Sequence, residues 1–507
     1  MTQTMRIALL VLCTSVYLLF APGRILFSDD EIVYQTTESL YERGDLVIAG
    51  IPKRSGEPKG RPAGTFGWAP GTDGKRYGFF GHGLSVVALP MYALGKTATV
   101  RTPETWRHAI RSDSFFLHRR SRAADWPRML VSFTNCLVTA LAVGVLAQWL
   151  LALGYSVRVG VTVALAYAFA TSAWAYSRTF LSEPLSALML LSAALGVTRF
   201  LSLRDERPTA ARAWLIGAAA LVGLSVHTHV LNVLAVPAYL VWLGLALRSR
   251  QEFNRHRTTM VLALLAGSVG LAMLGVSNHL RFGSPWETGR FAHYSHFVWP
   301  GEGVLAMLVA PGRSIFVYSP ALLLAALGVR ALARRHRSVL AFIVTMVALR
   351  RIFVGARSDW WGGWAIGPRF LLPLVPFMLV PLAEVLNHAR DASRRVRLAI
   401  ALAMAAAVAL SMHLASHSIF EHMVAISRDR ETPEYLAISH WAPNASPIAG
   451  FVGLKLDTLS LGALALSRHG HNGLLMVFVA LAALAVLAAG VLGLGLWRTP
   501  PLARSSD

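Results

Sequence analysis

Cysteine and charge are both scarce in this sequence. Only two cysteines occur among 507 residues, Cys13 and Cys136, and both lie inside apolar stretches, so no disulfide framework is expected. Charged residues make up 15% of the chain against 55% hydrophobic residues, and the mean hydropathy is +0.51. An ordinary soluble globular protein carries more charge. Apolar stretches long enough to cross about 30 Å of hydrocarbon recur, so the sequence predicts an integral membrane protein.

Acidic residues are scarcer than basic ones. Asp and Glu number 26 against 48 Lys and Arg, which gives a net charge of +22. Such a charge is typical of nucleic-acid-binding proteins, but here the arginines form short clusters between apolar stretches. Orientation of membrane proteins by positive cytoplasmic loops explains these clusters better, so no nucleic-acid partner is expected. No clear small-residue cleavage site accompanies the first apolar stretch, which favours a retained span over a signal peptide.

The apolar stretches predict an all-α polytopic membrane protein with about twelve transmembrane helices, forming one domain over residues 1–507. The first stretch covers roughly residues 5–27. The others are expected near residues 128–152, 157–175, 184–200, 213–227, 230–247, 258–277, 316–331, 338–354, 370–388, 397–413 and 473–497. No ionisable group deep within a span and no pair of similar halves is expected.

The segment 78–98 decides the sidedness of the chain. If it does not cross the membrane, four successive loops with four arginines each face the cytoplasm, as basic residues require. These loops carry Arg199, Arg204, Arg207 and Arg212; Arg248, Arg250, Arg255 and Arg257; Arg330, Arg334, Arg335 and Arg337; and Arg390, Arg394, Arg395 and Arg397. The segment is therefore predicted to lie on the membrane surface, within an extracytoplasmic loop over 28–127. A second outer loop is expected over 413–472.

Three neighbouring acids, Asp29, Asp30 and Glu31, open the first outer loop. Carboxylates at a membrane surface must be solvated, paired or bound to a cation. One of them is a candidate general base toward an acceptor hydroxyl, and a second would orient that hydroxyl or hold a metal. The alternative is a solvated acidic cluster beside the membrane.

Arginines on the outer face oppose the orientation rule and need another reason to be there. Bidentate binding of a phosphate is one such reason. The candidate substrate-binding residues in these outer segments are Arg178, Glu183, Arg281, Arg313, Asp359, Trp364 and Arg369. The alternatives are an Arg178–Glu183 ion pair, an Arg369–Asp359 ion pair, and an interfacial aromatic belt that includes Trp364.

Metal and nucleotide sites find little support. His227 and His229 stand two residues apart, so they do not share a helix face, and neither HExxH nor CxxC accompanies them. The glycines over 78–83 match no P-loop and no GxGxxG fingerprint. No cofactor is therefore assigned, and a divalent metal stays an open alternative.

The order of these pieces resembles the GT-C superfamily of membrane glycosyltransferases, in particular the branch with protein O-mannosyltransferases and the lipid A aminoarabinose transferase. That branch places an Asp-Glu pair at the start of its first outer loop, as Asp30-Glu31 does here. The remaining matching pieces are Lys75-Arg76-Tyr77-Gly78 before the surface segment, Arg128 at the start of the second span, and Ser177-Arg178 near Glu183. The chain departs from the branch in its third acid, Asp29, and in lacking a large C-terminal soluble domain.

The resemblance implies a single inverting displacement at the outer face of a bacterial cytoplasmic membrane. A carboxylate, Asp30 in first place, takes the proton of an acceptor hydroxyl on a lipid, glycan or protein while a polyprenyl phosphate leaves the sugar. Arg128, Arg178 and Arg369 are the candidate phosphate ligands, with Arg369 the first choice, and a bound metal is the alternative. A flippase of lipid-linked sugar and a non-catalytic assembly subunit are the competing functions.

Overall fold

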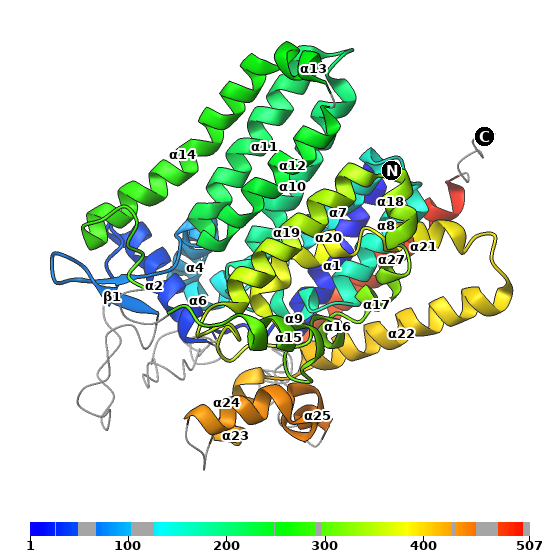
Figure 1. The fold of residues 1–507 in the computed structure, drawn as a ribbon. Coiled ribbons are helices and arrows are strands. Elements are labelled where there is room, and N and C mark those ends of the chain that lie inside the picture. The colour runs from blue at the N-terminus through cyan, green and yellow to red at the C-terminus, as the bar shows by residue number, and fades with distance from the viewer. Residues whose placement is uncertain are drawn as a thin grey trace.

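The structure is a computed structural model that describes residues 1–25, 27–48, 67–102, 126–247, 249–290, 296–427, 432–452 and 475–499. Parts of both predicted outer loops, 49–66, 103–125 and 453–474 among them, lie outside these residues. The described chain is almost entirely helical, with one two-stranded hairpin (Figure 1). The all-α prediction is confirmed.

Nine described helices are long and apolar enough to cross a membrane. They are α1 (Gln3–Phe20), α6 with α7 (Trp126–Ser132 and Thr134–Ala152), α10 (Glu183–Leu203), α11 (Pro208–Thr228), α14 (Arg257–Phe282), α19 (Arg337–Gly355), the run η2–α20–α21 (Arg369–Leu374, Val375–Met378 and Leu382–His388), α22 (Arg394–Ser416) and α27 (Leu475–Arg498). Two further predicted spans are shorter apolar helices, α8 (Val157–Phe169) and η1 with α12 (Val230–Ala235 and Val236–Ala246).

The span predicted near 316–331 is broken into three short helices, α16 (Ile315–Tyr318), α17 (Ala321–Ala326) and α18 (Val329–Arg335). Pro320 has no amide hydrogen to continue a helix from α16, and α17 starts anew after it. Gly328 precedes α18 at a point where the backbone of Pro381 passes so close that a Cβ on Gly328 would lie 2.0 Å from the Pro381 oxygen. The prediction of one continuous helix here is wrong.

The first span ends earlier than predicted, at Phe20, because Ala21 and Pro22 follow in extended or proline-restricted backbone and Gly23 has a φ of 67°. Helix α2 (Ser28–Glu42) then starts outside the bundle. The hairpin of β1 (Trp68–Pro70) and β2 (Arg76–Gly78) pairs Trp68 with Gly78, and α3 (Gly83–Val87) and α4 (Leu89–Arg101) follow it. No described helix over 78–98 reaches the length of a span.

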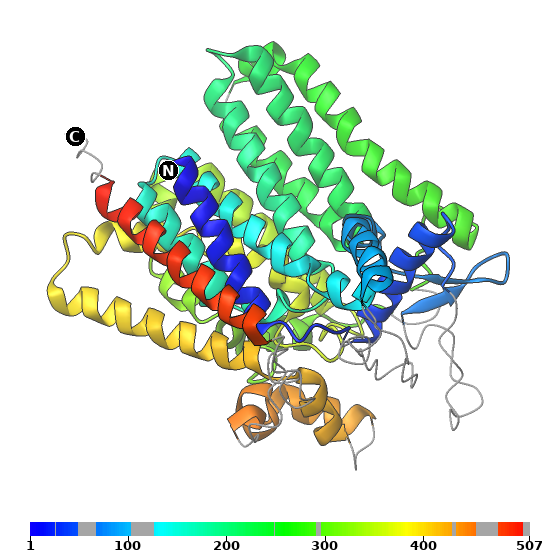
Figure 2. The same cartoon turned by 180° about the vertical axis from the view of Figure 1, so that it is seen from behind.

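The bundle has two distinct ends. In Figure 1, α13 (Arg250–Arg255) stands at the far end of α11 and α14, whereas α2 and β1 lie at their other end. Figure 2 shows α1 beside α27 from behind. The short helices α9 (Ala173–Tyr176) and α15 (Gly301–Val309) lie on the lower side of the bundle in Figure 1.

The helices α23 (Ile419–Ser427), α24 (Thr432–Trp441), η3 (Pro443–Ala445) and α25 (Pro447–Val452) form a small group after α22. Away from the terminal residues of the candidate spans, buried charged side chains include Arg350 in α19 and Glu384 in α21. Glu384 accepts a hydrogen bond from the Tyr155 hydroxyl at 2.6 Å. The expectation that no span carries a deep ionisable group is therefore wrong.

Candidate active site

The acidic triplet forms the first turn of α2. Helix N-termini favour negative side chains because the unpaired amide groups there carry partial positive charge. Asp30 and Glu31 are each only 1% exposed, while the Asp29 side chain is 25% exposed. The alternative of a solvated acidic cluster is thus wrong for Asp30 and Glu31.

Each acid of the triplet meets a different element. Asp29 accepts a hydrogen bond from Arg369 Nη2 at 2.7 Å, at the start of η2. Glu31 accepts two hydrogen bonds from Arg128 of α6, one of them at 2.8 Å from Nη2, and one from Gln35 at 2.9 Å. Successive helix positions point in different directions, so three adjacent acids join three parts of the fold.

Asp30 is the exceptional member of the triplet. Its Oδ2 accepts a hydrogen bond from the backbone N–H of Phe180 at 3.2 Å, and its Oδ1 has no hydrogen-bond partner among the described residues. Burial raises the pKa of Asp30 well above its usual value, and the negative charges of Asp29 and Glu183 add to this, against the opposing effects of Phe180 and Arg369. A buried carboxyl with a raised pKa and a free oxygen is suited to proton transfer.

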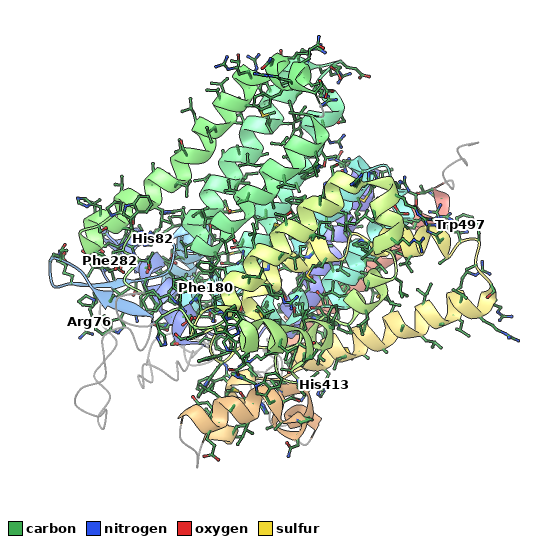
Figure 3. The ribbon with its side chains drawn as sticks, in the orientation of Figure 1. Arg76, His82, Phe180, Phe282, His413 and Trp497 are labelled. Atoms are coloured by element: carbon green, nitrogen blue, oxygen red, sulfur yellow. The ribbon has the colours of Figure 1, made fainter. Side chains whose placement is uncertain are left out.

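Phe180 thereby marks the middle of the site. In Figure 3 it lies between the hairpin side of the molecule, labelled by Arg76 and Phe282, and the His413 end of α22. The turn that carries it runs from the end of α9 to the start of α10, and it brings Ser177, Arg178 and Glu183 to the same region. The backbone of this turn therefore holds the candidate base.

Arg369 is enclosed by acids. Its Nε donates to Glu183 Oε1 at 2.9 Å in addition to the bond to Asp29, and both Arg369 and Glu183 are buried. Glu183 Oε2 has no hydrogen-bond partner in the part of the chain described. Two alternatives from the sequence are wrong: Glu183 pairs with Arg369 rather than with Arg178, and Arg369 does not pair with Asp359.

Arg128 and Arg178 differ in their surroundings. The Arg128 guanidinium is bound to Glu31 and lies 4.3 Å from the centre of the Tyr34 ring. Arg178 is buried, donates to the His417 carbonyl at 3.5 Å, and lines a small cavity with Phe27. Burial lowers the pKa of Arg178 to about 9. Arg128 therefore orients an acid of the site, and Arg178 borders the site from the side of α22.

The hairpin residues lie away from the acids. Lys75 is exposed and pairs with Asp73 at 3.4 Å, Tyr77 donates its hydroxyl to Asp73 at 2.8 Å, and Arg76 lies over the Trp68 ring at 4.8 Å. These contacts stabilise the hairpin turn. Among the described residues, no hydrogen bond or ion pair joins Lys75, Arg76 or Tyr77 to the acidic triplet, and their described partners lie in the hairpin.

Arg281 and Arg313 bind backbone oxygens. Arg281 donates to Gly78 O at 2.6 Å and to Asn278 Oδ1 at 2.9 Å, which ties α14 to the hairpin. Arg313 donates to Ala365 O at 2.7 Å and to Gly363 O at 3.2 Å, and so shapes the loop before η2. Both are buried.

Trp364 and its neighbours serve the packing of the helices after α22. Trp364 packs on the Phe420 ring at a centroid distance of 5.2 Å, and the Trp360 ring lies 5.0 Å from that of His440. These rings hold α23 and α24 against the loop before η2. Trp364, which the sequence offered for substrate binding or for an interfacial belt, is engaged with a protein ring here.

A cavity of about 110 Å³ lies between the segment after the hairpin, α11, η1, α14 and α19. Arg281, Arg290 and Arg357 line it, as does His229, and no acid does so among the described residues. Much of the remaining lining is apolar and includes Phe79, Phe80, Val226, Val230, Val233, Leu274 and Phe353. The cavity therefore combines cationic groups with an apolar wall.

Asp359 holds two of these arginines in place. Arg357 donates to it at 2.9 and 2.7 Å through Nε and Nη2, and Arg290 also bonds to Asp359 Oδ2. Burial acts to raise the pKa of Asp359, but the two guanidinium groups prevail and lower it to about 2. Arg290 and Arg357 were missed among the candidate site residues, although both are outer-face arginines and the argument applied to Arg281 covers them equally.

Phe370 joins the cationic cavity to the acids. Its ring lies 5.0 Å from the Arg357 guanidinium and 5.3 Å from that of Arg369. The His229 ring of the cavity is 5.9 Å from it. Ser182, which also lines the cavity, precedes Glu183. The two regions of opposite charge are therefore immediate neighbours.

The described residues contain no group of three or more His, Cys, Asp and Glu side chains arranged to hold a metal ion. His227 faces the His82 ring at a centroid distance of 5.3 Å, and His229 Nδ1 accepts the Leu231 amide at 3.2 Å. The two histidines thus point to different neighbours, and the arginines carry the positive charge of the site.

Comparisons with known proteins agree with this architecture. The model of the N-terminal domain of the protein O-mannosyl-transferase TMEM260 matches residues 124–254. The crystal structure of ArnT from Cupriavidus metallidurans bound to undecaprenyl phosphate is similar at a TM-score of 0.52 and 15% identity, covering 97% of this chain and 75% of ArnT. The apo oligosaccharyltransferase of Archaeoglobus fulgidus gives a TM-score of 0.54 and 12% identity, over 89% of this chain and 61% of that one. No curated protein sequence matches.

The chain has the fold of the polytopic GT-C membrane glycosyltransferases, and the resemblance predicted from the sequence is confirmed. The matched family region, 124–254, runs from the start of α6 into α13 and so includes Arg128, Arg178, Glu183 and the His229 side of the cavity.

Proposed function

We propose that this protein is a membrane glycosyltransferase that moves a sugar from a polyprenyl-phosphate donor to an acceptor hydroxyl. The reaction takes place on the extracytoplasmic face of a bacterial cytoplasmic membrane, by a single inverting displacement. The observation that carries this proposal is Asp30, a buried carboxyl with a raised pKa and a free oxygen, beside a cavity lined by arginines. Its placement fits a general base that works next to a developing negative charge.

The chemistry follows from the two neighbouring regions. Asp30 takes the proton of the acceptor hydroxyl while the acceptor oxygen forms a bond to the anomeric carbon. On the opposite face of the sugar, the bond from that carbon to the phosphate oxygen breaks, and the electron pair stays on the leaving polyprenyl phosphate. Asp29 and Glu183 keep Arg369 beside the base, and Arg128 fixes Glu31.

Arg290 and Arg357, rather than Arg369 or Arg128, fit the leaving phosphate best. Arg128 has a direct carboxylate partner and Arg369 has two, whereas the three cavity arginines have one acid among the described residues, Asp359, which Arg290 and Arg357 share. Guanidinium groups bind phosphate oxygens in pairs and stabilise the charge that develops on departure. The apolar wall of η1, α14 and α19 suits the isoprenoid chain of an amphipathic donor.

Purified protein in lipid, incubated with a panel of polyprenyl-phosphate sugars and acceptors, tests this function. Wild type should transfer the sugar with inverted anomeric configuration, and Asp30→Asn should not. Asp45→Asn, an exposed acid paired with Arg43 after α2, is the matched control and should keep the activity. Movement of the donor across the membrane with no transfer would favour a flippase and overturn the proposal.

A further inference from the structure

Arg350 is a buried arginine inside a candidate membrane span. It lies in α19, five residues before the helix ends at Gly355, and is only 2% exposed. Charged groups within the membrane are expensive and need internal partners. Arg351, the next residue, is part-buried and donates from Nε to Val304 O at 3.2 Å. The two adjacent arginines therefore have different tasks.

Arg350 connects two 3₁₀-helical segments of the bundle, η1 and η2. Its Nε donates to the Phe370 carbonyl of η2 at 2.6 Å, and its Nη1 donates to Asn232 Oδ1 of η1 at 2.8 Å. Asn232 is fully buried and donates in turn to Ser186 Oγ of α10 at 2.9 Å and to Ser225 O of α11 at 2.8 Å. One guanidinium thus ties α19, η2 and η1 together, and through Asn232 it reaches α10 and α11.

Both 3₁₀ segments, η1 and η2, border the candidate site. Segment η2 begins with Arg369, which contacts Asp29 and Glu183, and η1 follows His229, which lines the cationic cavity. A 3₁₀ turn has poorer internal hydrogen bonds than an α-helix, so outside contacts contribute more to its geometry. The bonds from Arg350 end on Phe370, next to Arg369, and on Asn232, three residues after His229.

We infer that Arg350 is a positioning residue. Through Phe370 and Asn232 it fixes η2, which begins at Arg369 beside the acids, relative to η1, which borders the cationic cavity. The inference rests on the proposed function for its catalytic consequence. Arg350 itself touches none of the reacting groups. A shift of about 1 Å between the reacting partners lowers the rate by about 100-fold, so a loose connection between η1 and η2 lowers turnover more than donor binding.

Three variants test this role. Arg350→Lys keeps the charge but replaces the planar two-point fork by a single ammonium. Asn232→Leu removes the other end of the link at similar volume. Arg351→Lys is the matched control on the same helix, since its described bond goes to α15. Each variant is compared at equal amounts of folded protein, by hydrogen exchange and by steady-state kinetics.

Hydrogen exchange should show that segments 230–235 and 369–374 lose protection together in Arg350→Lys and in Asn232→Leu, and in neither case in Arg351→Lys. In transfer assays, kcat should fall about 10-fold to 100-fold with a much smaller change in KM for the donor. The kcat of the double variant should be no lower than that of the less active single variant, because both substitutions remove the same link. These results together would support the positioning role.

Unchanged exchange in segment 369–374, or an unchanged kcat of the folded Arg350→Lys protein with only a lower melting temperature, would overturn it. If wild-type protein transfers no sugar from any donor while the exchange result holds, the proposed function fails and the structural link stands. The two failures are therefore distinguishable.

Discussion

At the scale of single residues, environment separates three acids that are adjacent in the chain. Glu31 is bound to the guanidinium of Arg128, and Asp29 to that of Arg369. Asp30 has only a backbone amide, and its burial favours the protonated form. The residue best suited to move a proton is the one that no arginine contacts directly among the described side chains.

Asp30→Asn is expected to remove turnover while leaving the fold and donor binding intact, because the amide has nearly the same shape but cannot accept a proton. Loss of a positioned general base lowers the rate by about 10²–10⁴-fold. Initial rates at saturating donor measure this effect. The rate of Asp29→Asn should fall less than that of Asp30→Asn. A fully active Asp30→Asn would assign the role of base to another group.

The raised pKa of Asp30 also predicts a pH dependence of stability. Between the pKa of the unfolded chain and the higher pKa of the folded one, the folded state holds more protons than the unfolded state. Stability therefore decreases as pH rises through this window, which begins near 4. Melting temperatures of wild type should fall more steeply with pH than those of Asp30→Asn. Equal slopes for the two proteins would contradict the burial of an ionisable group here.

Arg357 is the residue that we expect to bind the donor phosphate most directly. Arg357→Lys keeps one positive charge but loses the fork, so donor affinity should weaken by about tenfold. Binding of a polyprenyl phosphate to the purified protein measures this affinity. Arg43→Lys, at an exposed residue at the end of α2, is the control. Unchanged affinity in folded Arg357→Lys would assign the phosphate to other groups.

At the scale of elements, glycine sets the distance between α11 and α14. A Cβ on Gly223 would lie 2.1 Å from Gly267 O, and one on Gly270 would lie 2.1 Å from Gly223 C. The two backbones therefore touch, as small residues allow in membrane helix pairs. This close crossing supports one wall of the cationic cavity, since both helices contribute residues to it.

Gly223→Ala and Gly270→Ala are expected to separate these helices and to lower stability by about 1–3 kcal/mol, as overpacking does. Gly217→Ala on α11 is the control, because a Cβ there meets nothing within 4 Å. Thermal unfolding in detergent compares the three. A melting temperature of Gly223→Ala equal to that of Gly217→Ala would contradict the close crossing.

At the scale of the whole molecule, the two ends of the bundle differ in the charged side chains that they carry. Helix α13 with its arginines stands at the end opposite to α2, the hairpin and the candidate site (Figure 1). In a membrane, such an arrangement places the arginine-rich loops in the cytoplasm. Under the proposed function, this orientation puts the candidate site at the extracytoplasmic surface, where the lipid-linked sugar and the acceptor would meet.

Reporter fusions after Lys96 and after Arg204 should report opposite sides of the membrane. The physical reason is the cost of moving four arginine-rich loops across the bilayer. All four stay in the cytoplasm only if the segment 78–98 does not cross the membrane. Paired periplasmic and cytoplasmic reporters at each position make the assay internally controlled. Both positions on the same side would contradict the predicted first outer loop over 28–127.

The sequence by itself determined the membrane class, the order of most apolar helices and the position of the Asp29–Glu31 triplet after the first span. These features depend on hydropathy, charge and local spacing, which are properties of neighbouring residues. It also indicated Arg128, Arg178, Glu183 and Arg369, which the structure places around the triplet or along its border. It misjudged the continuous span near 316–331 and the absence of buried charge.

Only the tertiary structure decided which charges meet. The bonds from Arg128 to Glu31, from Phe180 to Asp30 and from Arg369 to Asp29 join residues 97, 150 and 340 positions apart. No local pattern encodes such pairs, because they depend on how the helices pack. The same packing pairs Arg369 with Asp29 and Glu183, leaves Asp30 with no bond to an arginine among the described residues, and gathers Arg290 and Arg357 in the cavity. The sequence determines which charged side chains are present, and the contacts between distant helices determine which partner each of them binds.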